Sequence, residues 1–102
     1  MSSEQQPLSL ASVVSASANQ VHARVGDDLV ILDLDSSLYY SLDPVGARVF
    51  ELLQEPTRLD TIADTIVAEF EVDAPTARRD LLALVDTLVA QKLVDARANA
   101  AG

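Results

Sequence analysis

Residues 38–50 read LYYSLDPVGARVF, and within them a strand pattern changes directly to a helix pattern. Alternation with a period of two divides the first five residues between two faces, with Leu38, Tyr40 and Leu42 on one and Tyr39 and Ser41 on the other. Asp43 and Pro44 then form a helix start, because the carboxylate accepts from free backbone N–H groups and a proline at the first helical position loses no hydrogen bond. A strand over 38–42 is therefore predicted to run into a helix over 44–54, with at least one tyrosine in the core.

Two further strands are predicted upstream of this junction. Residues 21–25 form one strand, a Gly-Asp turn follows, and residues 28–34 form the other. The four consecutive aliphatic residues within 28–34 suit a strand that is covered on both sides. A tight connection over 35–37 leads back to the strand at 38–42, and residues 13–20 are expected to add a short edge strand or an extended lead-in.

Two more helices are predicted after the first. Thr57 and Asp60 resemble a capping box for a helix that ends near Phe70, and Asp73 is placed to cap a third helix that continues to about Lys92. The third helix carries a core stripe of Ala77, Leu81, Leu84 and Leu88, with a second stripe of Leu82, Val85 and Val89 beside it. The two stripes cover an apolar arc of roughly 160°, whereas one core contact needs only roughly 100°. The third helix therefore has apolar surface to spare.

Length and composition favour one globular domain. The chain has 102 residues, of which 49% are hydrophobic and 23% charged, and this composition lies well outside the disordered range. A three-stranded antiparallel sheet followed by three helices defines an α+β fold with the layout of a winged helix-turn-helix. The folded domain is expected over residues 13–95, between a mobile N-terminal arm over 1–12 and a flexible C-terminal tail over 96–102.

Catalysis and cofactor binding are not expected. The chain has no cysteine, no glycine-rich phosphate loop and no serine nucleophile motif, and His22 has no partner at metal or triad spacing. The aspartates around Asp33 are interpreted as turn formers and surface groups, because they do not continue as a calcium loop. A secretory signal and an uncharged run of membrane-spanning length are also missing, so a cytoplasmic location is expected, with no membrane partner.

The arrangement of apolar surface predicts a groove for an extended peptide. An outer strand over 38–42 would offer unpaired backbone groups to an added strand, and the spare stripe of the third helix would receive the side chains of that strand. Arg78 lies next to this stripe on the helical wheel and is interpreted either as a solvated side chain or as an anchor for an acidic peptide residue. The candidate peptide-binding residues are Leu38, Tyr39, Tyr40, Ser41, Leu42, Arg78, Leu81, Leu82, Val85 and Val89. Which of the two tyrosines faces the groove is left open by the alternation alone.

Three segments together resemble the PqqD-like family of RiPP recognition elements. They are DDLVILDLDSSLYYSLDPVGARVFELL, then AEFEVDA at the end of the second helix, then RRDLLALVDTLVAQKLV. The resemblance covers roughly residues 13–95. Ser37 and Asp43 stand where the family more often has Gly and Asn, and Lys92 replaces the usual Gly before Leu93, so that the end of the third helix is in question.

The resemblance implies a non-catalytic protein that binds the leader region of a ribosomally made precursor peptide. The leader would pair as an added strand with residues 38–42, packed over the last helix. The Tyr-Tyr pair and the segment VGARVF look most like the free-standing recognition proteins of lasso-peptide pathways, whose partners are a leader peptidase and an ATP-dependent macrocyclase. Monomer and dimer are both left open.

Two other functions remain as alternatives. The first is a PqqD-type chaperone that presents a precursor peptide to a radical-SAM enzyme of a quinone-cofactor pathway. The second is a winged-helix regulator that binds nucleic acid, but the net charge of −9 would repel a phosphate backbone, so no nucleic-acid partner is expected.

Overall fold

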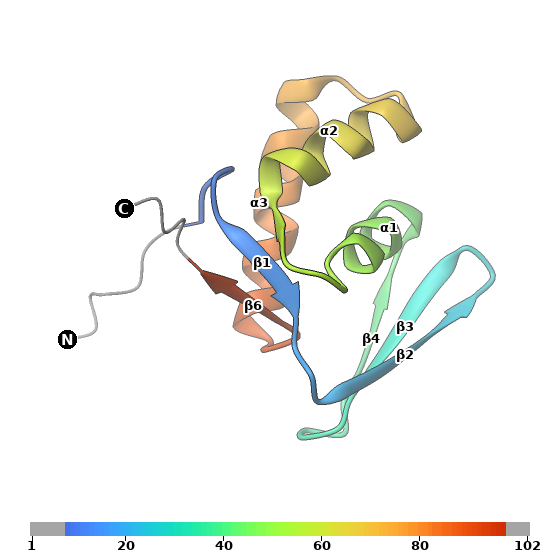
Figure 1. The fold of residues 1–102 in the computed structure, drawn as a ribbon. Helices are drawn as coiled ribbons and strands as arrows, with labels where there is room; N and C mark the ends of the chain where they lie inside the picture. The colour runs from blue at the N-terminus through green and yellow to red at the C-terminus, as the bar shows by residue number, and fades with distance from the viewer. Residues whose placement is uncertain (1–7, 98–102) are drawn as a thin grey trace.

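The structure is a computed structural model that describes residues 8–97 (Figure 1). In chain order the elements are β1 (Val13–Ala16), β2 (Gln20–Val25), β3 (Asp28–Asp33), β4 (Tyr39–Leu42), α1 (Pro44–Leu52), β5 (Thr57–Arg58), α2 (Leu59–Phe70), α3 (Ala74–Ala90) and β6 (Val94–Arg97). The expected mobile arm and flexible tail fall partly on residues 1–7 and 98–102, which lie outside the described residues. The α+β class is confirmed, with the expected three-stranded antiparallel sheet ahead of three helices.

The first sheet is a meander in the order β2–β3–β4, and Figure 1 shows α1 lying beside it. Both of its connections are antiparallel, as predicted. The expectation that the strand at 28–34 is covered on both sides is wrong. Leu29 and Ile31 are buried, whereas Val30 and Leu32, which alternate with them on the opposite face, are half-buried. The buried face belongs to the core, to which α1 also contributes and with which α1 contacts β3.

A second sheet has the strand order β5–β1–β6. Of its three strands, the sequence predicted only β1, as a short edge strand or an extended lead-in. The lead-in at β1 forms its central strand, and β6 pairs with β1 from Val94 opposite Ala16 to Arg97 opposite Val13. Residues 96 and 97 therefore belong to a strand and not to the expected tail. Leu93 and Val94 are buried, so β6 is held by the core as well as by its backbone pairing.

Residues 8–12 are packed on the core and do not form part of a mobile arm. Leu8 and Leu10 contact the core, and Ser12 is buried. The carbonyl of Leu10 accepts from the amide of Asp60 at 2.9 Å, and that of Ser12 accepts from the amide of Leu59 at 3.0 Å. The N-terminal segment thus satisfies amides that the start of α2 would otherwise leave unpaired.

This arrangement also replaces the predicted capping box. The Thr57 hydroxyl donates to the carbonyls of Leu52 and Glu55, and the carboxylate of Asp60 accepts from Arg58. Neither side chain is hydrogen-bonded to the other's backbone, because carbonyls from residues 8–12 have already taken the helix amides. The capping box was therefore a wrong prediction.

The other two predicted helix caps are confirmed. The Asp43 carboxylate accepts from the amide of Gly46 at 2.8 Å, and that of Asp73 accepts from the amide of Thr76 at 3.0 Å. Each cap sits at a helix whose first turn contains a proline. The Asp43 cap fixes the point at which β4 ends and α1 begins.

The three helices and both sheets share one core around Phe50. Its fully buried members include Leu29, Ile31, Val49, Leu53, Leu59, Ile62, Val85, Leu88 and Leu93. Arg48 ties α1 to α2 by donating to Glu69 at 2.8 Å, and this bond lowers the pKa of the Glu69 carboxyl. Within residues 8–97, no helix has both the length and the apolar character to cross a membrane.

Candidate functional site

One edge of β4 is open. Among the described residues β4 pairs with β3 alone, and the element contacts do not bring α3 against it. The amide of Asp33 donates to the carbonyl of Leu38 at 2.9 Å, so Leu38 turns its backbone groups toward β3. In an antiparallel ladder this direction alternates, and the N–H and C=O groups of Tyr39 and Ser41 therefore point away from β3. They form a ready pairing edge for another extended chain.

The side chains of β4 divide as the alternation predicted, and the structure places both tyrosines. Tyr39 lies on the outer face of the sheet and is 70% exposed. On the inner face, Leu42 is buried, Tyr40 is half-buried against the core, and Leu38 is 55% exposed. The inner face of this strand therefore becomes more exposed from Leu42, next to α1, toward Leu38.

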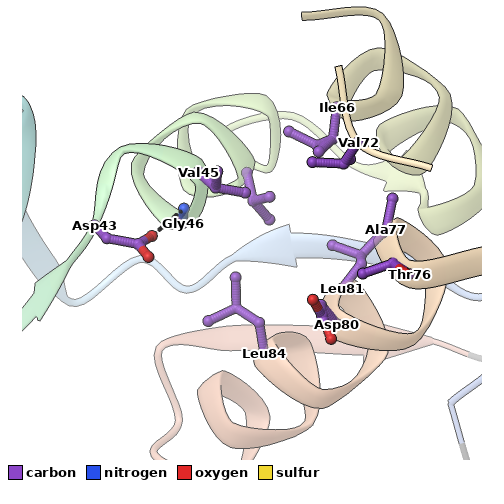
Figure 2. Close-up of a pocket in the computed structure, with 11 residues that line it drawn as sticks. Asp43, Val45, Gly46, Ile66, Val72, Thr76, Ala77, Asp80, Leu81 and Leu84 are labelled. Carbon is purple, nitrogen blue, oxygen red and sulfur yellow. Dashed lines mark hydrogen bonds between the residues drawn. The ribbon is translucent and has the colours of Figure 1, made fainter. Parts of the chain in front are cut away.

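A hollow of about 310 Å³ lies between the start of α1, the end of α2 and the first half of α3 (Figure 2). It adjoins the C-terminal end of β4, because Asp43 follows that strand directly and lines the hollow. Its walls are mainly apolar, and the lining residues are Asp43, Val45, Gly46, Val49, Ile66, Val72, Thr76, Ala77, Asp80, Leu81 and Leu84. The lining of the apolar hollow therefore begins at the residue that follows β4.

Two carboxylates give the hollow a negative charge. One oxygen of Asp43 is engaged by the amide of Gly46. Asp80 is exposed, and its only ion pair among the described residues is a long one of 3.7 Å to its neighbour Arg79, which is also exposed. Among the described residues that line the hollow, none is Lys or Arg.

The predicted residues of α3 fall on different sides of the helix. Leu81 lines the hollow, whereas Val85 has no exposed surface and belongs to the core. Leu82 and Val89 are half-buried against the core and, like the exposed Arg78, do not line the hollow. The spare stripe that was predicted from the helical wheel is therefore not the wall of this hollow.

The wall is formed instead by Thr76, Asp80 and Leu84, which follow one another at four-residue spacing and so share one side of α3. The helical wheel assigns Leu84 to the core stripe, whereas in the structure it is half-buried against the core and lines the hollow. Val45 of α1 lies across the hollow from Leu84 (Figure 2), and Val49 of the same helix also lines it. This side of the helix is identified by the position of α1 across the hollow from α3, which a single helical wheel does not contain.

Groups suited to chemistry are not gathered at this site. His22 packs edge-on against Phe50, with ring centroids 5.4 Å apart and planes at 82°, as an ordinary strand residue. Within residues 8–97, no cluster of three or more His, Cys, Asp or Glu side chains is arranged to hold a metal ion. What the geometry offers is a backbone edge and an apolar hollow, which are the elements of peptide binding.

Residues 28–94 match the family described as coenzyme PQQ synthesis protein D, PqqD. The chain belongs to the PqqD family. The matched region runs from β3 through the first residue of β6 and includes the open edge of β4 and the whole of the hollow. Membership in this family confirms that the chain is not an enzyme.

Two solved structures are similar to this PqqD-family chain. TbiB1 in complex with the TbiA(beta) leader peptide is 38% identical, with a TM-score of 0.74 over 79% of this chain and 94% of that one. Lasso peptide synthetase B1 complexed with the leader peptide is 24% identical, with a TM-score of 0.72 over 80% of this chain and 96% of that one; at this identity the match supports the fold alone. A search of curated proteins found no significant match.

Proposed function

We propose that this protein binds the leader region of a ribosomally synthesised precursor peptide as an added strand on β4. The observation that carries the proposal is the open edge of β4, followed in the chain by a residue that lines an apolar hollow, in a protein 38% identical to one solved with a leader peptide. The protein does no chemistry itself. Its effect is to raise the local concentration of the precursor near the enzymes that process it.

The backbone of β4 supplies the first part of the binding energy. Tyr39 and Ser41 together offer two N–H and two C=O groups along the free edge. Each hydrogen bond to a guest strand contributes about 0.5 to 1.5 kcal/mol net, and this contribution does not depend on the sequence of the guest. Backbone pairing therefore gives affinity without selecting one peptide.

Selection comes from the side chains of the guest. Because side chains alternate along a strand, every second residue of the peptide would point to the inner face of the sheet. There it meets Leu38, Tyr40 and, at the end of the strand, the hollow bounded by Val45 and Leu84. The outward-facing residues of the peptide would lie beside Tyr39.

The pathway that we propose is lasso-peptide maturation in the cytoplasm, with a leader peptidase and an ATP-dependent macrocyclase as partners. Its support is the resemblance of the segment 39–50 to the recognition proteins of those pathways. The second candidate is delivery of a precursor to a radical-SAM enzyme of quinone-cofactor synthesis, which the PqqD description of residues 28–94 favours. Co-purification of the tagged protein with the processing enzymes encoded beside its gene distinguishes the two.

The pairing edge can be tested at Ser41. Proline at this position removes the outward N–H and is tolerated at an edge strand, because the bonds to β3 come from the neighbouring residues. Alanine at the same position removes only the exposed hydroxyl. A fluorescein-labelled leader peptide from the precursor encoded beside the gene should bind the wild type and Ser41→Ala alike, and Ser41→Pro at least tenfold more weakly, while thermal melting shows that all three are folded. Equal affinity for the folded Ser41→Pro variant would contradict the proposed pairing.

A further inference from the structure

The hollow between α1 and α3 combines apolar walls with carboxylates. Val45, Val49 and Leu84 form apolar sides, and the two charged side chains among its lining residues are both acidic, Asp43 and Asp80. A guest side chain that enters it must therefore cover apolar surface and must not be an acid.

We propose that the hollow receives a Lys or Arg side chain of the bound peptide, and that Asp80 is the residue that selects it. The inference rests on the proposed function. Long basic side chains lay an aliphatic stem along apolar surface and keep the charged end at its rim. Here the stem would lie between Val45 and Leu84, and the charged end would meet Asp80 and the free oxygen of Asp43.

Asp80 is suited to this role because it is not committed elsewhere. Its contact with Arg79 joins two exposed neighbours at 3.7 Å, and such pairs contribute little. The predicted anchoring of an acidic guest residue by Arg78 concerns another position of the peptide, because Arg78 does not line the hollow.

The test uses the labelled leader peptide together with peptides in which each Lys or Arg is replaced in turn by Met, which keeps a long apolar stem without the charge. On the protein side, Asp80→Lys is compared with Asp86→Lys. Asp86 is an exposed residue of the same helix outside the hollow, so both variants change the net charge equally. Thermal melting checks that both remain folded.

We expect one replacement in the peptide to weaken binding to the wild type by about three- to fivefold, which is the range of an exposed ion pair. Asp80→Lys should weaken binding of the unmodified leader by more than Asp86→Lys does. The Asp80→Lys variant should bind a leader in which Glu replaces that one basic residue more tightly than it binds the unmodified leader. Equal effects of the two variants, or a bound leader in which no basic residue matters, would overturn the charge selection and leave leader binding intact. Failure of the unmodified leader to bind would instead reject the proposed function and the inference with it.

Discussion

The amide of Ser37 donates to the carbonyl of Asp33 at 2.8 Å, and this contact closes the turn between β3 and β4. Ser37 adopts a φ of +62° there, in the left-handed region that glycine occupies without strain. The family's preference for Gly at this position therefore has a physical cause in this chain. Ser37→Gly is expected to raise the free energy of unfolding by about 0.5 to 1 kcal/mol, measured by urea denaturation.

The neighbouring residue provides the control for this turn. The Ser36 hydroxyl donates to the Asp33 carboxylate at 3.1 Å and accepts from the amide of Leu38 at 3.2 Å. Ser36→Gly should therefore lower stability. A result in which both glycine variants destabilise the protein would show that Ser37 is not strained.

Lys92 presents the same situation at the end of α3. Its φ is +64°, its amide donates to the carbonyl of Val89, and the amide of Leu93 donates to that of Leu88, which is the bonding pattern of a Schellman motif. The helix thus ends as it would with glycine, and the lysine tolerates the left-handed conformation. Lys92→Gly should raise the thermal unfolding midpoint, whereas Gln91→Gly, at a φ of −89°, should lower it. The reverse order of the two midpoints would contradict this reading of the helix end.

Substitutions of Leu84 and Leu82 can distinguish the observed hollow from the binding wall that the helical wheel predicted. Both are half-buried leucines of α3, but only Leu84 lines the hollow. Leu84→Ala is expected to weaken leader-peptide binding by about tenfold, because it removes apolar contact of roughly 1 to 2 kcal/mol, whereas Leu82→Ala should leave affinity nearly unchanged. Calorimetric titration of both variants measures the difference. A larger loss for Leu82→Ala would move the binding surface to the other side of α3.

The Asp73 cap makes stability depend on pH. Its hydrogen bonds to Thr76 lower the pKa of the carboxyl in the folded state. The stabilisation is therefore present above the pKa of the unfolded chain and is lost as pH falls through the lower folded value. Asparagine caps a helix comparably but does not titrate. Between about pH 5 and pH 3, Asp73→Asn should lose less stability in urea than the wild type does; equal losses would show that this carboxyl does not contribute.

Features set by local chemistry were predictable from the sequence. The strands of the β2–β3–β4 sheet were predicted from the aliphatic run of 28–34, the turn signals on either side of it and the alternation of 38–42, and Asp43 and Asp73 were predicted as caps because each precedes a helix that has a proline in its first turn. Hydrogen-bond partners that lie far apart in the sequence were not predictable in this way. β6 exists because it pairs with β1, and α2 is capped by carbonyls of Leu10 and Ser12, whose side chains carry no signal for that role.

The candidate site shows the same division. Residues 38–42 were identified as an edge strand from their own alternation and their position at the end of the meander. On α3, the helical wheel gave the width of the apolar arc, but it did not show which part of that arc faces the other elements of the fold. Val85 and Leu84 are adjacent in sequence and roughly 100° apart on the helix, and the packing of α1 and α2 decides which of them is buried and which lines the hollow.

The most direct measurement is amide hydrogen exchange at Tyr39 and Ser41 by NMR, with and without saturating leader peptide. The outward-facing amides of these two residues should exchange at least tenfold more slowly in the complex, because each donates to the added strand. The amides of Tyr40 and Leu42, which face β3, should change less. A saturated complex in which Tyr39 and Ser41 exchange as fast as in the free protein would show that the peptide does not bind as a strand on β4.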